Sequence, residues 1–146
     1  MEGKPGTTRG LSLLPVETVL KAPKTTTLTR FSWQDTEGTG YEIHMGQTTR
    51  KNGEPLFHVW QRNSVSCEDQ DGCVADNFRI MGTYIHGLFD TPGITSRWLS
   101  SIGLGNVEVS KTHGLAARDK QYDLLADHFE NNINISDIAK NAGVNL

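Results

Sequence analysis

The stretch Phe78–His86 (FRIMGTYIH) constrains the fold of this chain more than any other segment. Its apolar side chains fall at both odd and even positions, as Ile80, Met81 and Ile85 show. This pattern is typical of a strand that is buried on both faces in an α/β sheet. Gly87 follows at once, so the strand is predicted to end at His86. We expect the imidazole to emerge at the carboxyl edge of the sheet, where open α/β sheets place their active sites.

The rest of the first half also predicts strands. Four short segments are rich in β-branched and aromatic residues, which favour extended structure. They are Val16–Leu20, Thr25–Trp33, Gly40–Gly46 (GYEIHMG) and Phe57–Gln61. The first two are separated by Lys21-Ala-Pro23, and the last two by a polar, turn-rich segment.

The second half predicts helices. Thr91 is a good N-cap and Pro92 suits the first helical position, where its missing N–H costs nothing. Ile94, Trp98 and Ile102 then recur on one face, and Gly103 ends the helix.

A second helix is predicted from about Asp119 to Asn131, with Tyr122, Leu125 and Phe129 on its buried stripe. A short third helix follows Ser136 and stops at Gly143. Strands first and helices later indicate an α/β or α+β segment.

Composition is that of a soluble globular protein: 146 residues, 36% hydrophobic, with a net charge of −3. One domain is expected, with residues 1–9 as a disordered lead-in and residues 10–146 as the folded part. No basic stripe gathers on any segment, so no nucleic-acid partner is expected. No apolar run approaches the ~20 residues of a membrane span, and no signal peptide is visible, so we expect a cytoplasmic protein without a membrane partner.

The two cysteines, Cys67 and Cys73, are too few for a disulfide scaffold. They lack C-x-x-C spacing and nearby His partners, so no metal site is expected. Asp71-Gly72 is typical of a hairpin tip. Both cysteines are therefore interpreted as residues of a surface loop without a chemical role.

Three residues could carry chemistry. His86, at a strand end, could act as general base towards a thiol, although its position alone slightly favours a packed core histidine. Glu42 and His44 lie two apart in a strand, so both project to one face. They could orient another histidine or contact a polar substrate, or they could form a solvated face.

Three blocks, Gly10–Leu20 (GLSLLPVETVL), Gly40–Gly46 and Met81–Asp90 (MGTYIHGLFD), resemble the C-terminal glutamine amidotransferase domain of the cobyric acid synthase family. The resemblance runs from about Gly10 to Ile138. It implies a flavodoxin-like α/β fold of the class I amidotransferase type, a mixed sheet with flanking helices, of which this chain supplies the C-terminal part. It also implies that His86 is the catalytic histidine.

Members of that family hydrolyse glutamine through a Cys thiolate and a thioester. The ammonia goes to a synthetase domain that uses ATP and Mg²⁺ to amidate corrin carboxylates in cobalamin biosynthesis. By resemblance, glutamine is the direct partner, corrin and ATP belong to the synthetase domain, and this segment binds no cofactor. The family's nucleophile lies upstream of the block at Gly10, and neither Cys67 nor Cys73 matches it. We therefore expect a fragment that is inactive alone, and self-association as one way to cover an incomplete sheet.

Leu88 departs from the wider class I pattern. Most of these enzymes carry a Glu two residues after the catalytic His, where it fixes the ring's tautomer. The cobyric acid synthase group is similar to this chain in lacking it. The hypothesis is that Glu42 or a backbone carbonyl orients His86 instead.

Other readings are a related cobyrinic acid diamide synthase or an amidotransferase of cell-wall precursors, both of which share the Cys-His pair without the Glu. A further alternative is a non-catalytic interaction module in which His86 is a core residue. Residues 135–144 resemble the first helix and turn of a helix-turn-helix, but a recognition helix does not follow.

Overall fold

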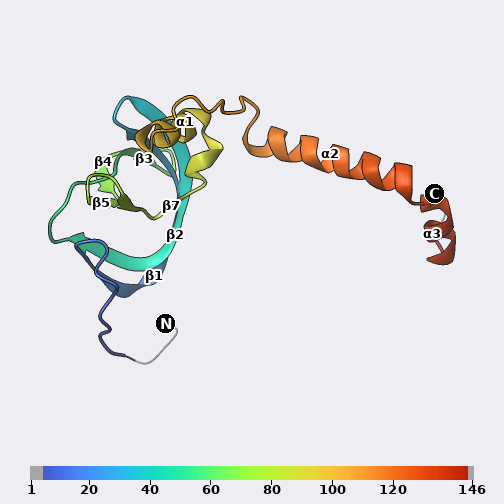
Figure 1. The fold of residues 1–146 in the computed structure, drawn as a ribbon. Helices are drawn as coiled ribbons and strands as arrows, with labels where there is room; N and C mark the ends of the chain where they lie inside the picture. Colours follow the sequence, from blue (N-terminus) through green and yellow to red (C-terminus); the bar gives the residue numbers. More distant parts are fainter. Residues whose placement is uncertain (1–4, 145–146) are drawn as a thin grey trace. The chain divides into compact units, whose positions relative to one another are not determined.

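A computed structural model describes residues 5–144 of the chain, the side chain of Leu115 excepted. The chain divides into two units, one up to Val109 and one from Ser110 onward. Within the described residues, the first unit contains β1 (Val16–Trp33), β2 (Thr36–Arg50), β3 (Phe57–Arg62), β4 (Val65–Asp71), β5 (Cys73–Ala75), β6 (Ile80–Gly82), β7 (Ile85–His86), the 3-10 turn η1 (Leu88–Asp90) and α1 (Pro92–Ser101). Figure 1 shows the long strands β1 and β2 of this unit, with α1 labelled near one end of them. The second contains α2 (Gly114–Asn132) and α3 (Ile135–Asn141). The predicted order, with strands in the first part of the chain and helices in the later part, is thus confirmed.

The longest feature is the hairpin of β1 and β2. Their pairing runs from Trp33 opposite Thr36 to Val16 opposite Arg50. The register shifts between Leu20 and Thr25, around the segment that contains Pro23, which lacks a backbone N–H for the ladder. The two strands predicted on either side of this segment are therefore one strand with an irregularity.

The main sheet has the strand order β4-β3-β1-β2-β7, and β5 and β6 form a separate two-stranded sheet. Every strand pair within residues 5–144 is antiparallel. The expected combination of strands and helices is present, but the mixed sheet, with some parallel pairs, is not found in the described part of the chain.

The prediction for Phe78–His86 is wrong. The segment begins with a turn and then splits into β6, in the small sheet, and β7, at the edge of the large one. Between them, the Thr83 hydroxyl and the Tyr84 N–H donate to the carboxylate of Asp71. The Tyr84 N–H, which in a continuous strand would be available to a neighbouring strand, therefore bonds to a side chain. The apolar run is consequently divided between two sheets.

The predicted hairpin tip at Asp71-Gly72 is also wrong. The β3–β4 hairpin turns at Asn63 and Ser64, which both have positive φ. Asp71-Gly72 instead carries the chain from β4 in one sheet to β5 in the other. Cys67 and Cys73 consequently lie in strands rather than in a surface loop.

The two faces of the five-stranded sheet differ. The face that carries Thr29, Phe31, Glu42 and Val59, here called the covered face, holds the core. That core consists of Phe31, Trp33, Leu56, Phe57, Val59, Val74, Ile85 and Ile94. The other face, here called the open face, carries Leu28, Tyr41, Ile43 and His86, which are all exposed.

Helix α1 confirms its predicted position, but Ile102 lies just beyond its last residue and is 48% exposed, and the Thr91 side chain makes no capping hydrogen bond. The helix starts after Thr91 with Pro92 in its first turn, and Ile94 is fully buried. A Cβ at Gly38 would lie 2.9 Å from Ile94, so this glycine lets the helix approach β2. Arg97 secures the contact, because its Nε donates to the Thr36 hydroxyl at 2.9 Å.

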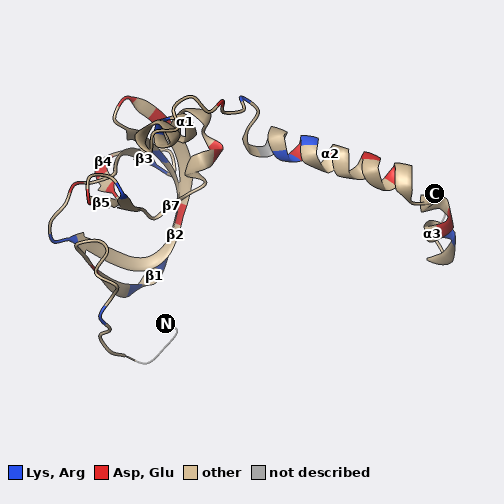
Figure 2. Ribbon diagram, viewed as in Figure 1, with Lys and Arg blue, Asp and Glu red and all other residues tan. Residues whose placement is uncertain are grey.

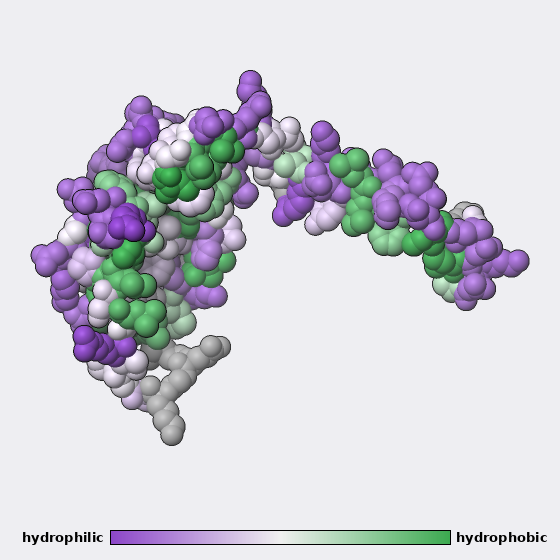
Figure 3. Space-filling model, in the orientation of Figure 1, coloured by the Kyte–Doolittle hydropathy of each residue, from purple (hydrophilic) through white to green (hydrophobic). Residues whose placement is uncertain are grey.

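In the second unit, α2 and α3 appear near their predicted places, although α3 already begins at Ile135, before Ser136, with Asn134 as its N-cap. The predicted buried stripe of α2 is wrong, because Tyr122, Leu125 and Phe129 are 47–61% exposed. Apolar side chains are visible along this helix in Figure 3. No helix among the described residues combines the length and the apolar character that crossing a bilayer requires.

Candidate functional site

His86 ends β7, a two-residue edge strand. Tyr41 lies directly opposite it on β2, and Ile85 lies opposite Glu42. Gly87 follows in the left-handed region, with φ of 72°, which a glycine adopts without strain and which turns the chain into η1. His86 therefore ends a strand before a glycine turn and is exposed, as predicted, but it lies on the open face of an antiparallel sheet rather than at the carboxyl edge of an α/β sheet.

The Tyr41 ring lies against the His86 ring. Their centroids are 5.1 Å apart and their planes differ by 14°, an offset stack. Within the described residues, neither ring nitrogen of His86 has a hydrogen-bond partner. The exposed imidazole thus has the Tyr41 ring against one face and no hydrogen bond from the described residues.

Glu42 lies on the covered face and is 3% exposed. Its Oε1 accepts from the Thr29 hydroxyl at 2.8 Å and from Arg62 Nε at 2.9 Å. Burial alone raises the pKa of Glu42, but the hydrogen bonds from Arg62 and Thr29 and the Arg62 charge outweigh it. The pKa of Glu42 consequently lies below its ordinary value.

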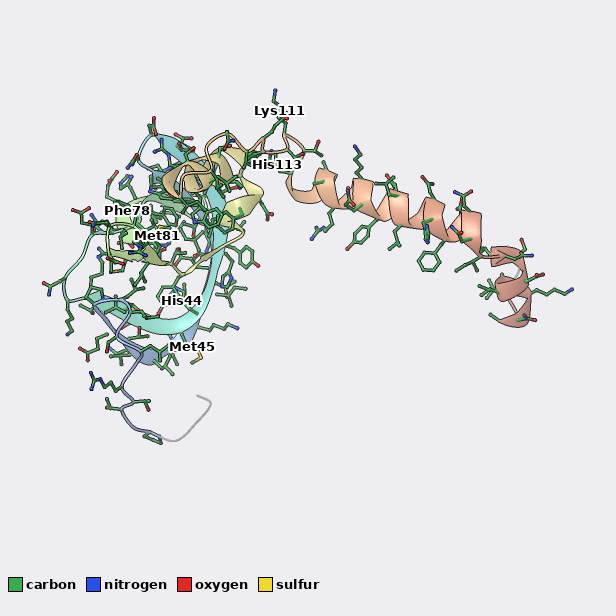
Figure 4. The ribbon with its side chains drawn as sticks, viewed as in Figure 1. His44, Met45, Phe78, Met81, Lys111 and His113 are labelled. Carbon is green, nitrogen blue, oxygen red and sulfur yellow. The ribbon has the colours of Figure 1, made fainter. Side chains whose placement is uncertain are left out.

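His44 joins the same group, as expected from its spacing to Glu42. Its Nε2 lies 3.2 Å from Glu42 Oε2 and its Nδ1 lies 2.8 Å from the carbonyl oxygen of Gly46. The ring also stacks on Tyr84, with centroids 3.9 Å apart. Figure 4 labels His44 and its neighbour Met45 on β2, whose side chains alternate between the faces of the sheet.

The structure brings Glu42 and His44 together but does not bring Glu42 to His86. Residues opposite each other in an antiparallel pair share a face, and strand neighbours point to opposite faces. Since Tyr41 is opposite His86, Glu42 points to the other side of the sheet. The hypothesis that Glu42 orients His86 is therefore not supported by this geometry.

Asp71 is a second buried carboxylate, 5% exposed, that the sequence did not single out. It accepts from the Thr83 hydroxyl and from the Tyr84 N–H. Burial raises the pKa of Asp71, these hydrogen bonds oppose the rise in part, and the Glu42 charge adds to it. Asp71 thus fixes the segment that leads into β7 and His86.

Glu42, His44 and Asp71 line a cavity of about 490 Å³ on the covered face. Arg62, Thr83 and Tyr84 contribute further polar groups to its wall. His86 is not part of this wall. The described residues contain no group of three or more His, Cys, Asp or Glu side chains suited to a metal ion.

Neither thiol lies on a strand that neighbours His86. Cys67 lies on β4, at the opposite edge of the sheet from β7, and four strand spacings amount to about 19 Å. Its Sγ donates to the Val59 carbonyl. Cys73 is 2% exposed in the small sheet, and its Sγ lies 3.9 Å from the Asn52 carbonyl oxygen. Both cysteines are free.

Sequence comparison decides the family. Residues 1–93, which include both GYEIHMG and His86, match the CobB/CobQ-like glutamine amidotransferase domain. The chain belongs to this family. The resemblance noted from the three blocks is thereby confirmed.

Relatives with curated names point the same way. The chain is 36% identical over its whole length to a cobyric acid synthase of Chlorobaculum tepidum. It is 37% identical over 94% of its length to a cobyric acid synthase of Clostridium tetani, and 36% identical over 92% to one of Chlorobium phaeobacteroides. It spans only 27–29% of the length of these relatives. No solved structure matches the chain.

Sequence reasoning missed Tyr41, Arg62, Thr29 and Asp71. Tyr41 lies inside a block that had been singled out, but only the cross-strand register puts it beside His86. Arg62 and Thr29 come from other strands than Glu42, and nothing in their local sequence indicates a buried carboxylate partner. Asp71 had a local signal, its pairing with Gly72, which predicted a turn instead.

Proposed function

We propose that this chain supplies the general base of glutamine hydrolysis in a cobyric acid synthase, and that His86 is that base. The family assignment gives the class of reaction, glutamine amidotransfer. The observation that carries the residue assignment is the exposed imidazole at the end of β7. Its two nitrogens are unengaged within residues 5–144, so either can exchange a proton with a reacting group.

In this mechanism His86 removes the proton of a thiol, and the thiolate attacks the carboxamide carbon of glutamine. The tetrahedral intermediate collapses to a thioester, and the imidazolium gives its proton to the departing ammonia. The imidazole then takes a proton from water, whose oxygen attacks the thioester. The thiolate leaves and is reprotonated, and glutamate is released.

The thiol has to come from outside the described residues. Cys67 lies at the far edge of the sheet and Cys73 is sealed in the small one, and both sulfurs contact backbone carbonyls. We therefore propose that the 146-residue chain by itself releases no glutamate. A flavodoxin-like arrangement of the complete domain, with the nucleophile near His86, is part of the same proposal.

The further steps belong to the whole enzyme. From the family resemblance alone, we propose that ammonia is used with ATP and Mg²⁺ to amidate corrin carboxylates in a separate synthetase domain of a cytoplasmic enzyme. The described residues do not offer a carboxylate cluster for Mg²⁺. No step assigned to this chain depends on either group.

The test is the substitution His86→Ala in the full-length protein. We expect glutamate release to fall by about a hundredfold to ten-thousandfold, because a general base contributes about that much. Amidation supported by added ammonium should persist, since it bypasses glutamine. His58→Ala is the matched control, because His58 is a half-exposed histidine on β3 that contacts Glu68. Undiminished glutamate release by His86→Ala would refute the proposal.

A further inference from the structure

Tyr41 is a residue of the block GYEIHMG to which the proposed function assigns no role. Glu42 and His44 serve the covered face, but Tyr41 projects to the open face. It lies opposite His86 and stacks on its ring at 5.1 Å between centroids. Tyr41 is 43% exposed, so the contact with His86 is not simply enforced by a surrounding core.

We propose that Tyr41 is the positioning residue for His86, holding the imidazole flat so that its nitrogen edges face the reacting groups. This inference rests on the proposed function of His86. An exposed histidine on an edge strand rotates freely about two side-chain bonds. A parallel aromatic ring covers one face of the imidazole and disfavours the rotamers that turn it away, while leaving both nitrogens free.

Gly40 makes the stack possible. A Cβ at Gly40 would lie 2.5 Å from the backbone oxygen of His86, so only glycine lets β7 approach β2 this closely. Gly87 has a different role, because its φ of 72° favours glycine and turns the chain directly after His86. The close pairing of β7 with β2 thus brings the two rings together.

The neighbouring carboxylate cannot take this role. Glu42 is on the opposite face and is engaged by Thr29, Arg62 and His44. Its network instead holds the β2 backbone beneath Tyr41. Leu88 occupies the position two residues after His86, so the orienting contact comes from across the sheet rather than from the same segment.

The experiment compares Tyr41→Leu with Tyr41→Phe in the full-length protein. Tyr41→Leu should lower kcat for glutamate release about tenfold while KM for glutamine stays within about twofold, since a misplaced base slows chemistry rather than binding. Tyr41→Phe keeps the ring and should retain nearly full kcat. Ile43→Ala is the matched control, since it removes an apolar side chain two residues along the same face of β2.

A spectroscopic readout tests the contact without activity. The stacked tyrosine ring should shift the His86 ring protons upfield in the NMR spectrum of the full-length protein. The shift should persist in Tyr41→Phe and disappear in Tyr41→Leu. These outcomes together support the positioning role.

The inference is overturned if Tyr41→Leu keeps full kcat, or if Tyr41→Phe is as impaired as Tyr41→Leu, since the hydroxyl rather than the ring would then matter. Failure of the proposed function is a separate result. In that case His86→Ala itself releases glutamate at the normal rate, whatever the Tyr41 variants do.

Discussion

The two faces of the five-stranded sheet differ in burial and in hydrogen bonding. On the covered face, Phe31 and Val59 are completely buried, and the carboxylate of Glu42 accepts hydrogen bonds from three side chains. On the open face, Leu28 is 73% exposed and His86 has only a ring stacked against it. The pleat of a single strand therefore separates a packed, hydrogen-bonded surface from an exposed one, because neighbours such as Tyr41 and Glu42 point to opposite sides.

The largest difference between the faces should be the loss of unfolding free energy when an apolar side chain is truncated. Phe31→Ala removes a ring that contacts Phe57 with centroids 4.6 Å apart, and it should lower the free energy of unfolding by about 3–5 kcal/mol. Leu28→Ala, on the open face of the same strand, should change it by less than about 0.5 kcal/mol. Chemical denaturation of both variants measures the contrast. Equal losses would show that the open face is also packed.

The second-largest difference between the faces should be the loss of unfolding free energy when an arginine is removed. Arg62→Met leaves Glu42 buried without its cation and should cost about 2 kcal/mol of unfolding free energy. Arg30→Met is the control, since Arg30 is exposed on the open face over the Trp60 ring and should cost less than about 1 kcal/mol. If Arg62→Met proves as mild as the control, Glu42 is solvated rather than buried.

A substitution that disturbs the close approach of β7 to β2 should lower the free energy of unfolding by somewhat less than Arg62→Met does. Gly40→Ala places a methyl group 2.5 Å from the His86 carbonyl oxygen and should destabilise by about 1–2 kcal/mol as β7 shifts. Gly10→Ala, where nothing lies within 4 Å, should be neutral. Thermal unfolding of the pair measures this, and a neutral Gly40→Ala would contradict the tight pairing.

The smallest expected effect is in the pH dependence of stability, because two buried carboxylates act in opposite directions. The lowered pKa of Glu42 means that its stabilisation is present above its ordinary pKa of 4.5 and is lost as the pH falls through its folded value. The raised pKa of Asp71 means that its contribution is complete below its ordinary pKa of 3.8 and is lost as the pH rises through its folded value.

Unfolding curves between pH 3 and pH 7 for Glu42→Gln and Asp71→Asn test this. The stability advantage of the parent chain over Glu42→Gln should shrink as the pH falls. Its advantage over Asp71→Asn should grow over the same range. Parallel curves for both variants would show that neither carboxylate has a shifted pKa.

Local signals in the sequence were sufficient for several parts of the molecule. The start of α1 at Pro92, the strand at Phe57 and the turn after His86 follow from proline placement, β-propensity and glycine placement. Charged residues of both signs are scattered over the first unit (Figure 2). Where a signal is local, it depends only on neighbours in the chain, and the prediction succeeds.

Predictions that required knowledge of distant partners failed. The apolar run 78–86 indicated one buried strand, but a carboxylate from β4 interrupts it at Thr83. The apolar positions of α2 follow a helical period, but periodicity does not tell whether a partner covers them, and Tyr122 is 61% exposed.

The sequence by itself determined the family of this protein, because the blocks around Glu42 and His86 are recognised from residue types and spacing along the chain. Only the tertiary structure decided which of these residues meet. Register across β2 and β7 puts Tyr41 beside His86 and turns Glu42 towards Arg62 on the other side. A shift of one residue would exchange these roles, since side chains alternate along a strand, and local sequence does not encode that register.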